Sequence, residues 1–132
     1  MTSKVTYLGN LRTECVHIKS SQSFITDAPT DNNGKGKAFS PTDTIATGLA
    51  NCMLTVMGIK ASALQIDMVG TTAEVTKTMG TDPRRITKIE VVINFPVTYN
   101  TKISKILEHT AKTCPVANSL HPEIEQIIIF NP

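Results

Sequence analysis

The chain has 132 residues, of which 40% are hydrophobic and 18% are charged, and it contains no Trp. This length suits one domain, residues 1–132, and the composition is that of a folded globular protein rather than a disordered or fibrous one. The net charge of +2 comes from scattered Lys and Arg residues, so nucleic acid is not an expected partner. We found no apolar run of the roughly 20 residues that a membrane helix needs and no secretory signal. We therefore expect a cytoplasmic protein that does not bind membranes.

The first third of the chain has the pattern of β-strands. An alternating run over 4–8, a Gly-Asn turn signal and a second run over 11–18 predict a hairpin. A Ser-Ser pair then allows another turn before a third strand over 22–27. The Pro, Asn and Gly content of "APTDNNGKGKAF" predicts a flexible loop after it, whose lysines we expect to be solvated.

A helix is predicted to begin at Pro41, because Ser40 can cap it and Asp43 lies beside the positive end of the helix dipole. Behind this start, apolar residues recur with helical period and predict one buried face: Ile45, Leu49, Cys52, Met53 and Val56. Two long strands over 66–79 and 84–97 then form a predicted antiparallel hairpin.

A second helix is predicted to begin near Thr101, and its apolar period places Cys114 on the buried face. Pro115 follows directly and biases Cys114 away from helical geometry, so a new turn can begin there. The β-branched run over 123–130 predicts a last strand. The order β-β-β-α-β-β-α-β indicates an α+β fold, an antiparallel sheet with two buried central helices.

The three cysteines form neither a close metal-type pair nor an even secreted framework, so we expect reduced thiols. Packing alone could explain Cys52, because free Cys behaves as a small apolar residue. Cys114 at a helix break has two traits of a resolving cysteine, which are freedom to move and nearby amides that favour a thiolate. The two side chains could meet where their helices cross, or both could be inert core residues.

Two segments of the chain, "FSPTDTIATGLANCMLTVMGI" and the later "AKTCPVANSL", resemble the OsmC/Ohr family of thiol peroxidases. The resemblance implies that Cys52 is the peroxidatic thiol, which attacks organic hydroperoxides, fatty-acid ones among them, and becomes a sulfenic acid. It implies that Cys114 then condenses with Cys52 to form a disulfide, whereas Cys15 has no counterpart role. It further implies an intertwined homodimer that uses no cofactor and is reduced by a dithiol or a lipoylated protein.

The resemblance also implies an activating arginine from the N-terminal strands, and Arg12 in "LGNLRTE" is the candidate. The family's partner carboxylate usually stands where this chain has Thr42. The remaining candidates to hold Arg12 are Glu14 and Asp43. An arginine without a partner would stabilise the Cys52 thiolate less well, so we expect peroxidase activity to be weak if neither carboxylate holds Arg12.

Two alternatives to a peroxidase remain open. The first is a non-catalytic dimer that binds an apolar small molecule and keeps its cysteines only as core residues, which the absence of a carboxylate at Thr42 favours. The second is a metal site built from Cys52, Cys114 and one of three histidines: His17, His109 or His121. No pair among these has zinc-ligand spacing, so we expect no metal.

Overall fold

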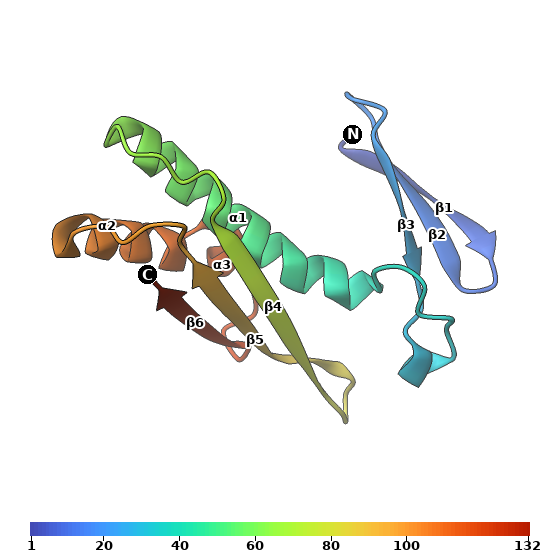
Figure 1. The fold of residues 1–132 in the computed structure, drawn as a ribbon. Coiled ribbons are helices and arrows are strands. Elements are labelled where there is room, and N and C mark those ends of the chain that lie inside the picture. Colours follow the sequence, from blue (N-terminus) through green and yellow to red (C-terminus); the bar gives the residue numbers. More distant parts are fainter. The chain divides into compact units, whose positions relative to one another are not determined.

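The computed structural model describes residues 1–132, which form two compact units, Met1–Ile45 and Ala46–Pro132. The first unit contains three strands and a short 3-10 helix: β1 (Ser3–Gly9), β2 (Arg12–His17), β3 (Ser23–Asp27) and η1 (Thr30–Asn32). Helix α1 (Pro41–Ala63) begins in the first unit and continues into the second. The remaining elements belong to the second unit (Figure 1): β4 (Thr72–Gly80), β5 (Arg85–Asn94), α2 (Thr101–Lys112), α3 (Pro115–Ser119) and β6 (Glu125–Asn131).

The first unit is a three-stranded antiparallel sheet in the order β1-β2-β3, as the sequence predicts. The turn between β1 and β2 is centred one residue later than expected, because Gly9 pairs with Arg12 and leaves Asn10 and Leu11, with φ of 54° and 62°, as the two loop residues. A two-residue hairpin loop of this kind matches the natural twist of the flanking strands. Few side chains of the unit are buried, and they are all polar: Thr26, Asp27 and Ser40.

The second unit contains a sheet of order β4-β5-β6, in which β4 and β5 are antiparallel, as predicted. β6 instead runs parallel to β5, so the expectation of a wholly antiparallel sheet is wrong for this strand. The cause is the connection through α2 and α3, because a helical crossover returns the chain to the end of the sheet where β5 began. The first strand of the hairpin is also shorter than predicted and begins only at Thr72, after a turn in which the Thr71 amide donates to the Met68 carbonyl.

The core of the second unit combines residues of α1, β5 and α2 that are completely shielded from solvent: Leu49, Met53, Met57, Ile89, Val91, Ile93, Leu107 and Ala111. The buried stripe of α1 passes through Leu49, Met53 and Met57 and differs in part from the predicted face. Ile45 is 48% exposed, while Cys52 and Val56 pack against the edge of the core. Small residues beside the stripe, among them Ala46 and Ala50, are also buried, so the centre of the buried face lies away from Cys52.

By length and composition, α1 is also apolar enough to cross a membrane, with a mean hydropathy of 1.2 over 18 residues. The helix contains no uninterrupted apolar run of the length that the sequence prediction requires, because polar Thr and Asn residues divide the segment. Core helices of globular proteins pass the same criterion, and α1 contributes its apolar stripe to the core of the second unit.

Ile89→Val is expected to lower the free energy of unfolding by about 1 kcal/mol, because it removes one methylene from a fully buried position in β5. Ile129→Val is the matched control on β6, where the side chain is 45% exposed. It should lower the free energy of unfolding by clearly less than Ile89→Val does. Urea titration followed by circular dichroism measures both values. Equal losses of unfolding free energy in the two variants would contradict the claim that burial of Ile89 determines its contribution.

Candidate active site

Two of the three thiols lie together in the second unit. Cys52 projects from α1 at the edge of the core, and Cys114 follows α2 and is 1% exposed. Both are free thiols, and interaction with the Cys52 side chain is one of the causes that raise the pKa of Cys114. The two helices therefore bring together the residues that the sequence placed on separate apolar faces.

Cys114 is held at a break between two helices. Its backbone is extended (φ −68°, ψ 154°), Pro115 begins α3, and the Cys114 Sγ accepts a hydrogen bond from the Ala117 amide at 3.4 Å. The expected start of a new turn at Pro115 is thus present. Burial raises the pKa of the Cys114 thiol above its ordinary value of 9.0 and outweighs the lowering effect of the Ala117 and Val116 amides. The helix amides thus favour a Cys114 thiolate, as expected, but desolvation has the larger effect on its pKa.

This raised pKa predicts how disulfide closure depends on pH. Closure of the Cys52–Cys114 disulfide that the family resemblance implies needs the Cys114 thiolate, so its rate should rise about tenfold between pH 7 and pH 8, a range that lies below the raised pKa. Rapid mixing with one equivalent of cumene hydroperoxide, acid quenching and peptide mass analysis would follow closure. A closure rate that is constant over this range would contradict the assignment of a neutral, buried Cys114.

Arg12 is held by Asp27 in the first unit. Arg12 Nε and Nη2 donate to the two carboxylate oxygens of Asp27 at 2.7 and 2.9 Å. The Asp27 side chain is 3% exposed and the Arg12 side chain 38%. A third donor, the Lys37 amide, lies 3.2 Å from Asp27 Oδ2. The hydrogen bonds from Arg12 lower the pKa of Asp27, and the same pair raises the pKa of Arg12.

Neither carboxylate expected from the sequence holds Arg12. The Asp43 carboxylate accepts the Ser40 amide at 2.9 Å, while Ser40 Oγ accepts the Asp43 amide at 3.1 Å, which makes a capping box at the start of α1. Glu14 lies two residues beyond Arg12 on β2, opposite Ile25 rather than Asp27. The partner that sequence analysis missed is Asp27, which the β2–β3 register places directly opposite Arg12.

The remaining candidate residues lie elsewhere. Cys15 belongs to β2 of the first unit, opposite Val5 on β1 and Phe24 on β3. His17 hydrogen-bonds with Ser20, and the His121 ring accepts the Glu123 amide. The structure contains no group of three His, Cys, Asp or Glu side chains arranged to hold a metal ion.

Residues 34–128 match the family model of the OsmC-like proteins. The chain is an OsmC-like protein. This OsmC-like protein shares 56% sequence identity with a solved protein of Psychrobacter arcticus named for an osmotic stress and detoxification response. That match covers 99% of this chain and 96% of the other, with a TM-score of 0.97.

Two more distant structures share the fold of this OsmC-like protein. The organic hydroperoxide resistance protein OsmC of Legionella pneumophila is 16% identical, with a TM-score of 0.74 over 100% of this chain and 98% of the other. The organic hydroperoxide resistance protein OhrB of Bacillus subtilis is 16% identical, with a TM-score of 0.70 over 99% and 98% of the two chains. A comparison with curated proteins gives no match.

Proposed function

We propose that this protein reduces organic hydroperoxides in oxidative stress defence, with Cys52 as the peroxidatic thiol and Cys114 as the resolving thiol. The observation that carries the proposal is that Cys52 packs against the core cluster that contains Cys114, in a chain of the OsmC-like family. Similarity to hydroperoxide resistance proteins supports the same class of reaction. No cofactor is needed, because the two thiols supply both electrons.

The proposed cycle has three steps. The Cys52 thiolate attacks the distal oxygen of the hydroperoxide, an S–O bond forms as the O–O bond breaks, and the alkoxide takes up a proton to become the alcohol. The Cys114 thiolate then attacks the Cys52 sulfenic acid, so that a disulfide forms as the S–O bond breaks, and the hydroxide that leaves takes up a proton to become water. A dithiol or a lipoylated protein restores both thiols by exchange and becomes a disulfide itself.

Arg12 is proposed to be the cation that stabilises the Cys52 thiolate, and Asp27 is proposed to take the role of the family carboxylate. The two hydrogen bonds between Arg12 and Asp27 hold the guanidinium plane in one orientation. In this proposal Asp27 supplies the carboxylate that is missing at Thr42. Neither Glu14 nor Asp43 is needed for this function.

A cytoplasmic homodimer is the proposed form of the protein. The first unit exposes many large apolar side chains: Val5, Tyr7, Leu8, Leu11, Ile18, Phe24 and Phe39. A sheet whose buried residues are all polar gains little stability from apolar burial of its own, so a second copy that covers these side chains would stabilise it. Reduced thiols agree with a reducing compartment.

The proposal is tested by adding one equivalent of cumene hydroperoxide, and separately of hydrogen peroxide, to the reduced protein. Free thiols are counted and disulfides are mapped by peptide mass. Rapid loss of two thiols to a Cys52–Cys114 disulfide with cumene hydroperoxide is expected. Survival of all three thiols would overturn the proposal.

A second candidate is a binding protein for an apolar small molecule, with structural cysteines. The burial of Cys114 favours it, because a buried neutral thiol reacts slowly. In that case an apolar ligand would raise the melting temperature in a saturable way, and the increase would survive Cys52→Ser.

A further inference from the structure

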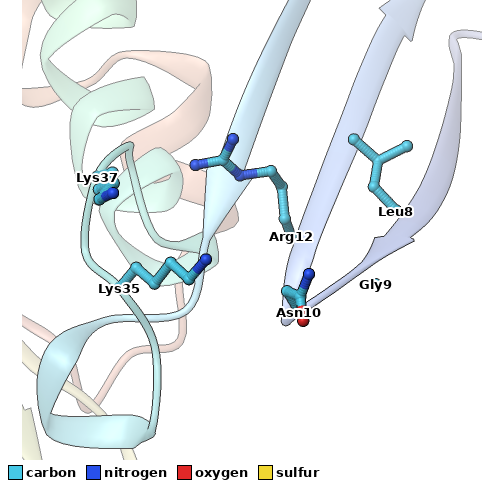
Figure 2. A pocket seen from close by; sticks show the side chains of 6 residues that line it. All are labelled: Leu8, Gly9, Asn10, Arg12, Lys35 and Lys37. Carbon is cyan, nitrogen blue, oxygen red and sulfur yellow. The ribbon is translucent and has the colours of Figure 1, made fainter.

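The first unit contains a small pocket beside the Arg12–Asp27 pair. Its volume is about 260 Å³, and its lining residues come from the β1–β2 turn, from β2 and from the loop before α1: Leu8, Gly9, Asn10, Arg12, Lys35 and Lys37. Figure 2 shows Lys35 extending from the loop toward β2 and β3, while the Arg12 guanidinium points back toward the loop. All six residues belong to Met1–Ile45, so the pocket is complete without the second unit.

The charge around this pocket is positive. Three of the six lining residues are cationic and none is acidic. Asp27 compensates Arg12, because its two carboxylate oxygens accept hydrogen bonds from the guanidinium Nε and Nη2. Neither lysine ammonium forms a salt bridge. Three cations and one carboxylate therefore leave a net charge of +2, which belongs to the two lysines.

The loop that carries the two lysines is folded onto β3. The Gly36 amide donates to the Ala28 carbonyl at 3.2 Å. The Lys37 amide donates to Asp27 Oδ2, also at 3.2 Å, so the carboxylate that orients Arg12 holds the loop as well. A Cβ atom on Gly34 would lie 1.7 Å from the Ala28 oxygen, so only glycine allows this close approach. The lysines are therefore carried by a loop with defined contacts.

We propose that Lys35 and Lys37 form, with Arg12, a binding site for a phosphate group, either free or as the monoester of a small organic molecule. A phosphate dianion matches the net charge of +2, whereas a carboxylate or another monoanion leaves one cation uncompensated. Lysine binds phosphate as a point charge. Arg12 Nη1, which takes no part in the two hydrogen bonds to Asp27, adds a planar donor.

The pocket also has room for a small organic part of the ligand. The Asn10 side-chain amide lines it and is a hydrogen-bond partner for a hydroxyl group, and Leu8 supplies an apolar contact. This site is separate from the proposed peroxidase reaction, because it needs neither Cys52 nor Cys114.

NMR titration of the full chain tests the site directly. Glycerol 3-phosphate and inorganic phosphate represent the two sources of a phosphate group, and acetate represents a carboxylate. Both phosphates should shift the backbone amide signals of Gly34 and Gly36 in a saturable way, and acetate should bind clearly more weakly. Tighter binding of the ester would support an organic phosphate as the ligand, and tighter binding of inorganic phosphate would support the free ion.

Three double variants separate the site from general charge effects. Lys35→Gln/Lys37→Gln should bind both phosphates about tenfold more weakly, because it removes the two uncompensated charges. Lys35→Arg/Lys37→Arg keeps these charges and should bind phosphate nearly as the wild type does. Lys102→Gln/Lys105→Gln removes two exposed charges from α2 and is the matched control, which should bind as the wild type does.

The pH dependence of binding distinguishes a dianion from a monoanion. A phosphate monoester gains its second charge at about pH 6, so the Kd for glycerol 3-phosphate should fall about tenfold from pH 5 to pH 7. Sulfate is a dianion throughout this range and should bind with constant affinity. The charge of the site itself is constant, because Arg12 lowers the pKa of Asp27 and no histidine lines the pocket.

Two results would overturn the phosphate site. One is equal phosphate binding by the wild type and by Lys35→Gln/Lys37→Gln. The other is acetate binding as tight as phosphate binding at pH 7, which would show that the pocket attracts any anion and does not recognise a dianion.

Discussion

Cys52→Ser is expected to lower peroxidase turnover with cumene hydroperoxide by about 1,000-fold or more, because a serine hydroxyl cannot replace a thiolate in the attack on the peroxide oxygen. Cys52 lies at the edge of the α1 stripe rather than in its centre. The substitution removes no fully buried group, so the fold should persist, and circular dichroism would confirm that. Steady-state oxidation of a dithiol reductant measures the loss.

Two further variants separate the roles of the cysteines. Cys114→Ser should still consume one equivalent of hydroperoxide, since only the closing step needs the second thiol, and a sulfenic acid at Cys52 should accumulate. Cys15→Ser should keep turnover within about twofold of wild type, because Cys15 lies on β2 of the first unit and takes no part in the proposed cycle. Full turnover by Cys52→Ser, or none by Cys15→Ser, would overturn this division of roles.

Asp27→Asn is expected to reduce the rate of the first step, the oxidation of Cys52, by about 10- to 100-fold. The substitution removes a charge and leaves one oxygen where two now accept Arg12 Nε and Nη2. In the proposed mechanism Asp27 acts through Arg12 and is a positioning residue. Its lowered pKa keeps the carboxylate ionised at and above pH 5, so its contribution should be constant there and be lost only as the pH falls through that pKa.

Stopped-flow measurement distinguishes this role from a general loss of structure. The oxidation of Cys52 should slow in Asp27→Asn, whereas closure of the disulfide by Cys114, which involves α1 and the end of α2, should keep its rate. Glu14→Gln is the control, since Glu14 is a carboxylate on the same strand that does not pair with Arg12. An equal effect of both substitutions would show that net charge, not the Arg12–Asp27 pair, controls the rate.

The order of elements could be predicted because each has a local signal. The capping box of Ser40 and Asp43 marks the start of α1, and Pro115 marks the start of α3. The direction of β6 could not be predicted, because the β-branched run around Ile128 is equally suitable for a parallel or an antiparallel partner. Direction depends on the crossover through α2 and α3, which is a property of the tertiary fold.

The candidate site was predicted only in part, for a similar reason. Helical periodicity places Cys114 in the core, and the structure adds that Cys52 packs against the same core cluster. The pairing of Arg12 with Asp27 depends on strand register, and a shift of one residue in the β2–β3 turn would put Asp27 opposite a different residue. The expected turn at Ser20 and Ser21 does not give that register, so the sequence alone did not point to Asp27.

The sulfur of Cys114 belongs to the proposed resolving thiol and is also the cap of α3, where it accepts the Ala117 amide. A new bond to this sulfur restricts the orientation of its lone pairs, so a covalent change at Cys114 would weaken the cap on the first turn of a five-residue helix. A helix so short has little cooperative stability of its own. Opening of this segment, and the hydrogen exchange of its amides, is therefore coupled to the chemical state of a single sulfur atom.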